Sequence, residues 1–248
     1  MSRLHISPKF FTSISYWTNY NYVPAWQCND KQVIENGILK NPKTSLNGIT
    51  SCRQLFKDNT ELKEVPKFDT SKSTSFREMF SGCTNLTSVP KFDTSNGIET
   101  NMMFLHCKSL TEIPLFDTSK VTNFYQMFSG CTNLKSLPLL DCSSLTNAYL
   151  MLDNCRSLIT IPALDFSNVT NANFMLNSCF GVTEVNIINI GCNFDIHYTA
   201  MTRDAIVKLL NNLKTVTTTT TLTMGSSKLS LLTDEDKKIA TDKGWTIA

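Results

Sequence analysis

The chain has 248 residues, 41% of them hydrophobic and 18% charged, which is enough apolar content for one long domain or a domain with a small appendage. Its 23 Lys and Arg against 21 Asp and Glu give a net charge of +2, without the basic excess typical of nucleic-acid binders. No run of about 18 apolar residues occurs, so we expect no membrane insertion. The first residues also lack the apolar block of a standard secretory signal.

The N-terminal segment, residues 1–37, is rich in aromatic side chains. The seven aromatics are Phe10, Phe11, Tyr16, Trp17, Tyr20, Tyr22 and Trp26. Two interpretations remain open. The segment caps the exposed end of the repeats that follow, or it attaches the protein to other subunits or to a larger assembly.

From residue 38 to residue 198 the same residue types recur every 24 positions. The columns include Cys83, Cys107, Cys131, Cys155 and Cys179; Leu62, Leu86, Leu110, Leu134 and Leu158; Pro66, Pro90, Pro114, Pro138 and Pro162; Asp69, Asp93, Asp117, Asp141 and Asp165; and Met79, Met103, Met127, Met151 and Met175. Complete copies occupy residues 55–174, and a copy at 175–198 loses proline and aspartate. A partial copy precedes them at Ile38, Pro42 and Ile49.

A single unit is too small to fold alone, because its few buried side chains do not offset the entropy of ordering its backbone. Stacking supplies the missing burial, so the period predicts a repeat solenoid in which identical columns form lines along the axis. Within one unit we expect an extended edge at 110–116, a turn at Asp117-Thr118-Ser119, a second short strand at 121–124 and a tight helical turn at 127–131.

The unit M-F-x-x-C-x-x-L-x-x-[VI]-P-x-F-D-T-S resembles the BspA-like leucine-rich repeats of bacterial surface proteins and their phage relatives. The resemblance covers residues 38–198 and recurs in phase. It implies a right-handed solenoid of short parallel strands and helical turns, and a role in adhesion or recognition rather than catalysis. Less closely, residues 209–248 resemble the terminal module of such proteins in gut phages and their hosts.

Residues 199–248 leave the 24-residue phase and predict a small α+β cap. Apolar residues from Ala205 to Leu213 follow helical spacing, with Thr202 as N-cap. Residues 217–224 are β-prone. A capping box at Thr233, a helix stop at Gly244 and a final strand at 245–247 complete a helix-strand-helix-strand order.

The repeated polar columns have mainly structural interpretations. The cysteines lack the close pairs of metal sites, so we expect buried core thiols, with disulfides or a metal site as the alternatives. The aspartates are expected to cap turns, the alternative being a cation ladder. Asn123, Asn147 and Asn171 are expected to form an amide ladder between coils. The three histidines share no phase and no phosphate-binding glycine loop occurs, so we expect no enzyme activity, no cofactor and no metal.

Recognition is expected at outward-facing columns that vary from copy to copy. One column reads Arg53, Arg77, Asn101, Tyr125, Tyr149 and Asn173. Tyr125 and Tyr149 should stack on adjacent coils beside Arg77, and tyrosine and arginine are favoured contact residues. Our candidate binding residues are therefore Tyr125, Tyr149, Arg77 and Arg53. A second column is expected to pack against the C-terminal module and reads Lys67, Lys91, Leu115, Leu139, Ala163 and Ile187.

These observations favour a non-enzymatic recognition protein. Without an export signal, the first hypothesis is a phage virion component, in a tail, baseplate or fibre, that binds a host surface glycan or protein. Its N-terminal segment would contact other virion proteins, and a homo-oligomer is possible. The alternatives are an adhesin at the bacterial cell surface or secreted from it, and an intracellular protein-interaction scaffold.

Overall fold

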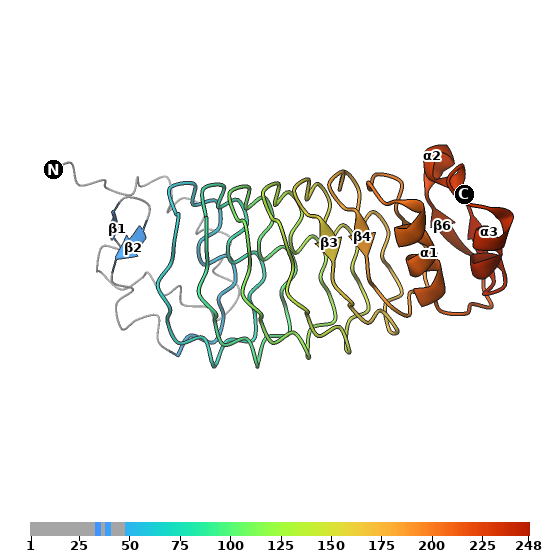
Figure 1. Cartoon of the computed structure of the whole chain (residues 1–248). Helices are drawn as coiled ribbons and strands as arrows, with labels where there is room; N and C mark the ends of the chain where they lie inside the picture. Colours follow the sequence, from blue (N-terminus) through green and yellow to red (C-terminus); the bar gives the residue numbers. More distant parts are fainter. Residues whose placement is uncertain (1–32, 36–37, 41–47) are drawn as a thin grey trace.

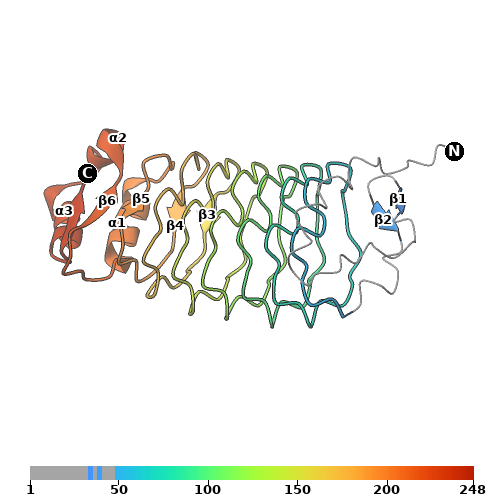
Figure 2. The same ribbon diagram turned by 180° about the vertical axis from the view of Figure 1, so that it is seen from behind.

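The computed structural model describes residues 48–248 together with the short segments 33–35 and 38–40. From residue 48 the chain winds through a row of similar coils, and helices lie at the C-terminal end of that row (Figure 1). The view from behind shows the same row of coils (Figure 2). The predictions for residues 1–32, 36–37 and 41–47 fall outside the described residues. Ahead of the coils, β1 (Val33–Glu35) pairs antiparallel with β2 (Ile38–Lys40).

Adjacent coils pair in parallel between positions 24 residues apart. Single parallel bridges join Ser51 to Ser75 and Ser75 to Glu99, and others join Asn123 to Asn147 and Asn147 to Asn171. Only the last coils pair for long enough to form strands, where β3 (Thr160–Ile161) lies parallel to β4 (Glu184–Val185).

Proline explains why the other coils carry no strand at this position. The column holds Pro66, Pro90, Pro114, Pro138 and Pro162, and proline has no N–H to donate to a ladder. In the last copy Asn186 takes this place, and its N–H donates to the carbonyl of Ile161 at 3.0 Å. The extended edge expected at 110–116 is therefore not a paired strand. The equivalent segment two coils later contains β3, which is paired.

The tight turn of each coil satisfies its backbone donors in two directions. Met127 N–H donates to Phe124 O at 3.0 Å within the coil, and Phe128 N–H donates to Met151 O at 2.9 Å in the next coil. The same alternation recurs in the equivalent turns. Because a buried, unpaired N–H is costly, this alternation lets a non-helical turn lie inside the stack.

The interior consists of apolar columns in contact along the axis. Neighbouring rings of Phe56, Phe80, Phe104 and Phe128 stack with centroids 5.4, 5.5 and 5.7 Å apart. The leucine and methionine columns are almost fully buried beside them. Stacking identical side chains therefore supplies the burial that one unit lacks.

The 24-residue phase shifts before the C-terminal elements begin. Asp165 bridges to Ile188, one residue short of the period, and Ile190 then bridges to Leu213. β5 (Phe194–Asp195) pairs parallel with β6 (Thr220–Thr223), which pairs parallel with β7 (Trp245–Ile247). This sheet joins the last coil to the C-terminal elements.

Three helices complete the C-terminal part: α1 (Arg203–Asn212), α2 (Gly225–Leu229) and α3 (Asp234–Thr241). Thr202 caps α1, and Thr233 forms a capping box with Asp236 at the start of α3. The helix-strand-helix-strand prediction is confirmed for α1, β6, α3 and β7. It missed β5 and α2, because both are short and α2 is built from Gly and Ser residues of low helix propensity.

Candidate functional site

The cysteine column lies in the interior of the stack and links adjacent coils. Each thiol donates to a carbonyl of the preceding coil, from Cys83 Sγ to Phe56 O at 2.9 Å through to Cys179 Sγ to Leu152 O at 3.1 Å. All five cysteines of the column are buried and free of disulfides, as predicted. Burial raises the pKa of Cys83, Cys131 and Cys179 to about 12. These thiols are therefore protonated at neutral pH and poorly reactive.

The aspartate column caps turns, as predicted. Asp117 Oδ1 accepts from Ser119 Oγ at 2.7 Å and from Ser119 N–H at 3.1 Å, and the same bonds recur at Asp69 and Asp93. The hydrogen bonds from Ser119 hold the pKa of Asp117 below its usual range. The threonine that follows each of these aspartates donates to a carbonyl of the next coil, as Thr118 Oγ1 does to Asp141 O at 2.8 Å.

The asparagine column does not form the expected ladder between coils. Asn123 Oδ1 accepts from Tyr125 N–H at 2.8 Å, and Asn147 Oδ1 accepts from Tyr149 N–H at 3.0 Å, both within one coil. Backbone bridges at these residues already join the coils, so the amides are used for local turns. Within residues 48–248, neither amide nitrogen has a hydrogen-bond partner.

Three aromatic side chains follow one another along the outside of the stack. Tyr125 and Tyr149 lie nearly parallel, with ring centroids 5.8 Å apart and planes inclined by 9°. Phe174, one coil further, meets Tyr149 edge-on at 5.9 Å and is 52% exposed. We call Tyr125, Tyr149 and Phe174 the aromatic strip. The predicted stacking of the two tyrosines is confirmed.

Phe174 was not predicted as part of this site. It belongs to the column after the tyrosines, where every copy adopts a left-handed backbone, with φ of 56° at Phe174. The left-handed turn changes the direction of this side chain, which the period alone does not reveal. The available signal was a large aromatic residue in a column otherwise held by Gln54, Glu78, Met102, Gln126 and Leu150.

The two candidate arginines lie apart from the tyrosines. Arg77 is separated from Tyr125 by the coil of Asn101, so the expected position of Arg77 beside the tyrosine pair is wrong. Its Nε instead donates to Glu78 Oε1 at 3.0 Å, and Lys57 forms a second ion pair with the same buried carboxylate. Arg53 lies one coil further away, and its buried Nε has no partner in the described part of the chain.

One family model matches the stacked coils. It is described as "Mycoplasma protein of unknown function, DUF285", and it matches residues 50–161 and 91–188, which together exceed half of the chain. The chain belongs to the DUF285 family. This is the family of BspA-like repeat proteins. No curated protein and no solved structure matches the chain.

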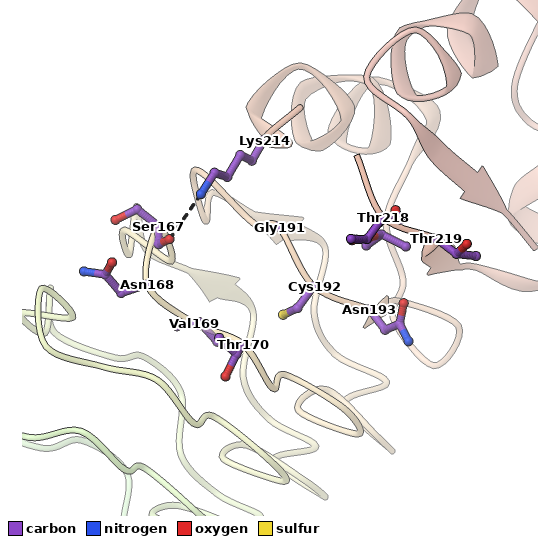
Figure 3. Close-up of a pocket in the computed structure, with 11 residues that line it drawn as sticks. Ser167, Asn168, Val169, Thr170, Gly191, Cys192, Asn193, Lys214, Thr218 and Thr219 are labelled. Atoms are coloured by element: carbon purple, nitrogen blue, oxygen red, sulfur yellow. Dashed lines mark hydrogen bonds between the residues drawn. The ribbon is translucent and has the colours of Figure 1, made fainter. Parts of the chain in front are cut away.

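A groove of about 360 Å³ lies where the coils of this DUF285 protein meet its C-terminal elements (Figure 3). Hydroxyl and amide side chains dominate its walls, among them Ser167, Asn168, Asn193 and Thr218. Lys214 is its one charged lining residue, and its Nζ donates to Ser167 O at 3.5 Å across the opening. The groove offers polar contacts with little apolar surface.

The second outward column, from Lys67 to Ile187, was expected to pack against the C-terminal module, and this expectation is wrong for most of its length. Leu115 and Leu139 are 49% and 61% exposed, so they do not pack against the C-terminal module, while Ile187 is fully buried. The reason is position, because α1 lies across the end of the row of coils and not along its side (Figure 1). Ala163 is exposed as well, and Ile187 is buried because the phase shifts there: Asp165 bridges to Ile188, so Ile187 lies in line with the buried Leu164.

In the described part of this DUF285 protein no group of three or more His, Cys, Asp or Glu side chains is placed to hold a metal ion. Over the same residues, no helix is long and apolar enough to cross a membrane.

Proposed function

We propose that this protein recognises a ligand on a host cell surface and catalyses no reaction. We further propose that its coils form a BspA-like leucine-rich repeat solenoid with a 24-residue period, capped by the C-terminal α+β elements. In this proposal the protein is a phage virion component, in a tail, baseplate or fibre. Its ligand is a surface glycan or a surface protein.

The observation that carries the proposal is the aromatic strip. Aromatic side chains at a surface supply much contact area at low entropic cost, and tyrosine is enriched among residues that dominate binding energy. The half-buried rings of Tyr125 and Tyr149 are held in place by each other, so little order is lost when a ligand binds. The unpartnered amide nitrogens of Asn123 and Asn147 add hydrogen-bond donors two residues before each tyrosine.

The repeated polar residues support the non-catalytic part of the proposal. The cysteine, aspartate and threonine columns each bond to backbone groups, so their chemistry is engaged in holding the coils. A nucleophile or base needs a partner that activates it, and the buried thiols instead have raised pKa values. The residues left to contact a ligand are those of the outward columns.

The test is a double substitution in the aromatic strip. We expect Tyr125→Ala with Tyr149→Ala to weaken binding of the purified protein to host cells by about tenfold or more, since each 1.4 kcal/mol of lost contact energy is tenfold in affinity. Binding to whole cells is measured by flow cytometry, and a glycan array then separates a glycan from a protein ligand.

Phe180→Ala is the matched control, because Phe180 is 54% exposed but packs on Tyr198 outside the strip. Its cell binding should equal that of the wild type. Unchanged binding by the folded double variant would contradict the role of the strip. Recovery of the protein in purified phage particles is expected, whereas recovery only in the bacterial envelope would support an adhesin.

A further inference from the structure

A groove of about 460 Å³ runs along the coils between two outward-facing columns. One wall consists of Lys67, Lys91, Leu115 and Leu139, and the other of Asp93, Asp117 and Asp141. The walls are two residues apart in each coil, and the residue between them, such as Phe92 or Phe116, is buried and forms the floor. This is the alternation of an extended chain, whose side chains point in and out by turns. We call it the leucine–aspartate groove.

The leucine wall is apolar surface that the fold leaves uncovered. Leu115 and Leu139 lie on adjacent coils and are 49% and 61% exposed, and the exposure of Leu139 is the largest among the bulky apolar side chains of the described residues. The C-terminal elements do not reach them. Adjacent exposed aliphatic residues with a charged rim are typical of interaction surfaces.

The aspartate wall is a row of carboxylates held in fixed positions. Asp117 Oδ1 accepts two hydrogen bonds from Ser119, and Asp141 Oδ1 accepts from Ser143 N–H at 2.9 Å. The Oδ2 atoms of both residues have no hydrogen-bond partner within residues 48–248. The hydrogen bonds from Ser95 hold the pKa of Asp93 below its usual range, while the neighbouring charges of Asp69 and Asp117 act against this lowering because like charges repel. A cation placed along this wall would relieve that repulsion.

We propose that the leucine–aspartate groove binds a basic polypeptide segment of another protein. Two residues of extended chain span about 7 Å, which a lysine or arginine side chain can bridge. Such a side chain lays its aliphatic stem over Leu115 or Leu139 and places its charged head at Asp117 or Asp141. A bare cation would need the aspartates and leave the leucines uncovered.

The two lysines at one end of the groove set the orientation of a bound segment. Lys67 and Lys91 continue the leucine wall toward the first coils and repel a basic side chain there. A bound segment therefore places its basic residues over the later coils and an acidic or uncharged residue at the lysines. This surface uses different columns from the aromatic strip and does not depend on the function proposed above.

Fluorescence anisotropy with labelled peptides tests the proposal on the full chain. The probe is a peptide of alternating arginine and leucine, and the comparison peptide carries glutamate in place of arginine. We expect the arginine peptide to bind and the glutamate peptide to fail. Affinity should fall as NaCl is raised, because the aspartate wall is exposed to solvent.

Two groove variants separate the walls. Leu115→Ser with Leu139→Ser, and Asp117→Asn with Asp141→Asn, should each weaken binding of the arginine peptide by about tenfold. Asparagine keeps an oxygen that accepts the turn hydrogen bond, so the second variant retains the fold. Ile159→Ser, at a residue 50% exposed, and Asp69→Asn, at an exposed aspartate that does not line the groove, should bind like the wild type.

Equal binding of both peptides, or of the arginine peptide to the wild type and both groove variants, would overturn the proposal. Loss in the aspartate variant alone would also overturn it, since simple cation attraction would then suffice. The variant with both strip tyrosines replaced should bind the arginine peptide normally. This result distinguishes failure of the groove from failure of the recognition role of the aromatic strip.

Discussion

At the scale of single residues, each coil carries two backbone positions in the left-handed region. The first holds Gln54, Glu78, Met102, Gln126, Leu150 and Phe174, and the second holds Asp58, Gly82, His106, Gly130, Asn154 and Ser178. A side chain in this conformation costs about 1–2 kcal/mol. The turn keeps it because the alternating hydrogen bonds to the same coil and to the next one require this path.

At the second position, glycine avoids a clash with a side chain of the preceding coil. A Cβ at Gly130 would lie 2.3 Å from His106 Nδ1, and one at Gly82 would lie 2.2 Å from Asp58 Oδ1. The side chains of Asp58 and His106 therefore require glycine on the next coil, whereas Asn154, whose Oδ1 accepts from Arg156 Nε at 2.7 Å, is followed by Ser178. In the first four coils the alternation along this column follows from contact between coils.

We predict that Gly130→Ala lowers the free energy of unfolding by about 2–4 kcal/mol, from backbone strain plus overlap with His106. Adding His106→Ala should remove the overlap and leave a loss of about 1–2 kcal/mol. Gly48→Ala is the control, because Gly48 has φ of +75° but open space around its Cβ. Urea denaturation gives the free energy of unfolding of the wild type and the three variants. A double variant no more stable than Gly130→Ala would contradict the contact with His106.

At the scale of elements, Asp236 holds the two longest helices together. It accepts from Thr233 N–H at 2.9 Å in the capping box of α3, and Arg203 at the start of α1 donates two bonds of 2.8 Å to it. The hydrogen bond from Thr233, together with Arg203, holds the pKa of Asp236 below its usual range. The carboxylate is therefore favoured in the folded state.

The sign of the pH dependence follows from that shift. The unfolded chain binds the proton of Asp236 more tightly, so the stabilising effect is present above about pH 4 and is lost as pH falls through the lower folded pKa. We predict that Asp236→Asn is less stable at pH 7 and loses less stability on acidification than the wild type. Asp234→Asn, at a fully exposed residue of α3, should leave the stability at pH 7 and its loss on acidification as in the wild type. Thermal unfolding between pH 7 and pH 3 measures both variants.

Local signals in the sequence predicted the C-terminal elements better than the strands of the coils. Thr202 and Thr233 mark helix starts by chemistry that acts within one turn, and both predictions are confirmed. Strand pairing depends on two coils at once. It appears at β3 and β4 because Asn186 replaces a proline, a consequence visible only after the coils are aligned.

At the scale of the whole molecule, the period predicted which side chains lie on adjacent coils but not which of them the fold leaves exposed. The Tyr125–Tyr149 stack follows directly from a spacing of 24 residues. The ion pair of Arg77 with Glu78 does not, because it joins neighbouring residues of one coil. The exposure of Leu139 depends on where α1 lies, and no local pattern reports that.

The whole account depends on equivalent residues lying over one another on successive coils. Anomalous diffraction from sulfur in crystals of the native protein tests this most directly. We predict one row of sulfur positions for Cys83, Cys107, Cys131, Cys155 and Cys179, each 2.9–3.2 Å from a carbonyl oxygen of the preceding coil. Sulfur atoms scattered through the molecule, or paired at about 2.05 Å as disulfides, would contradict it.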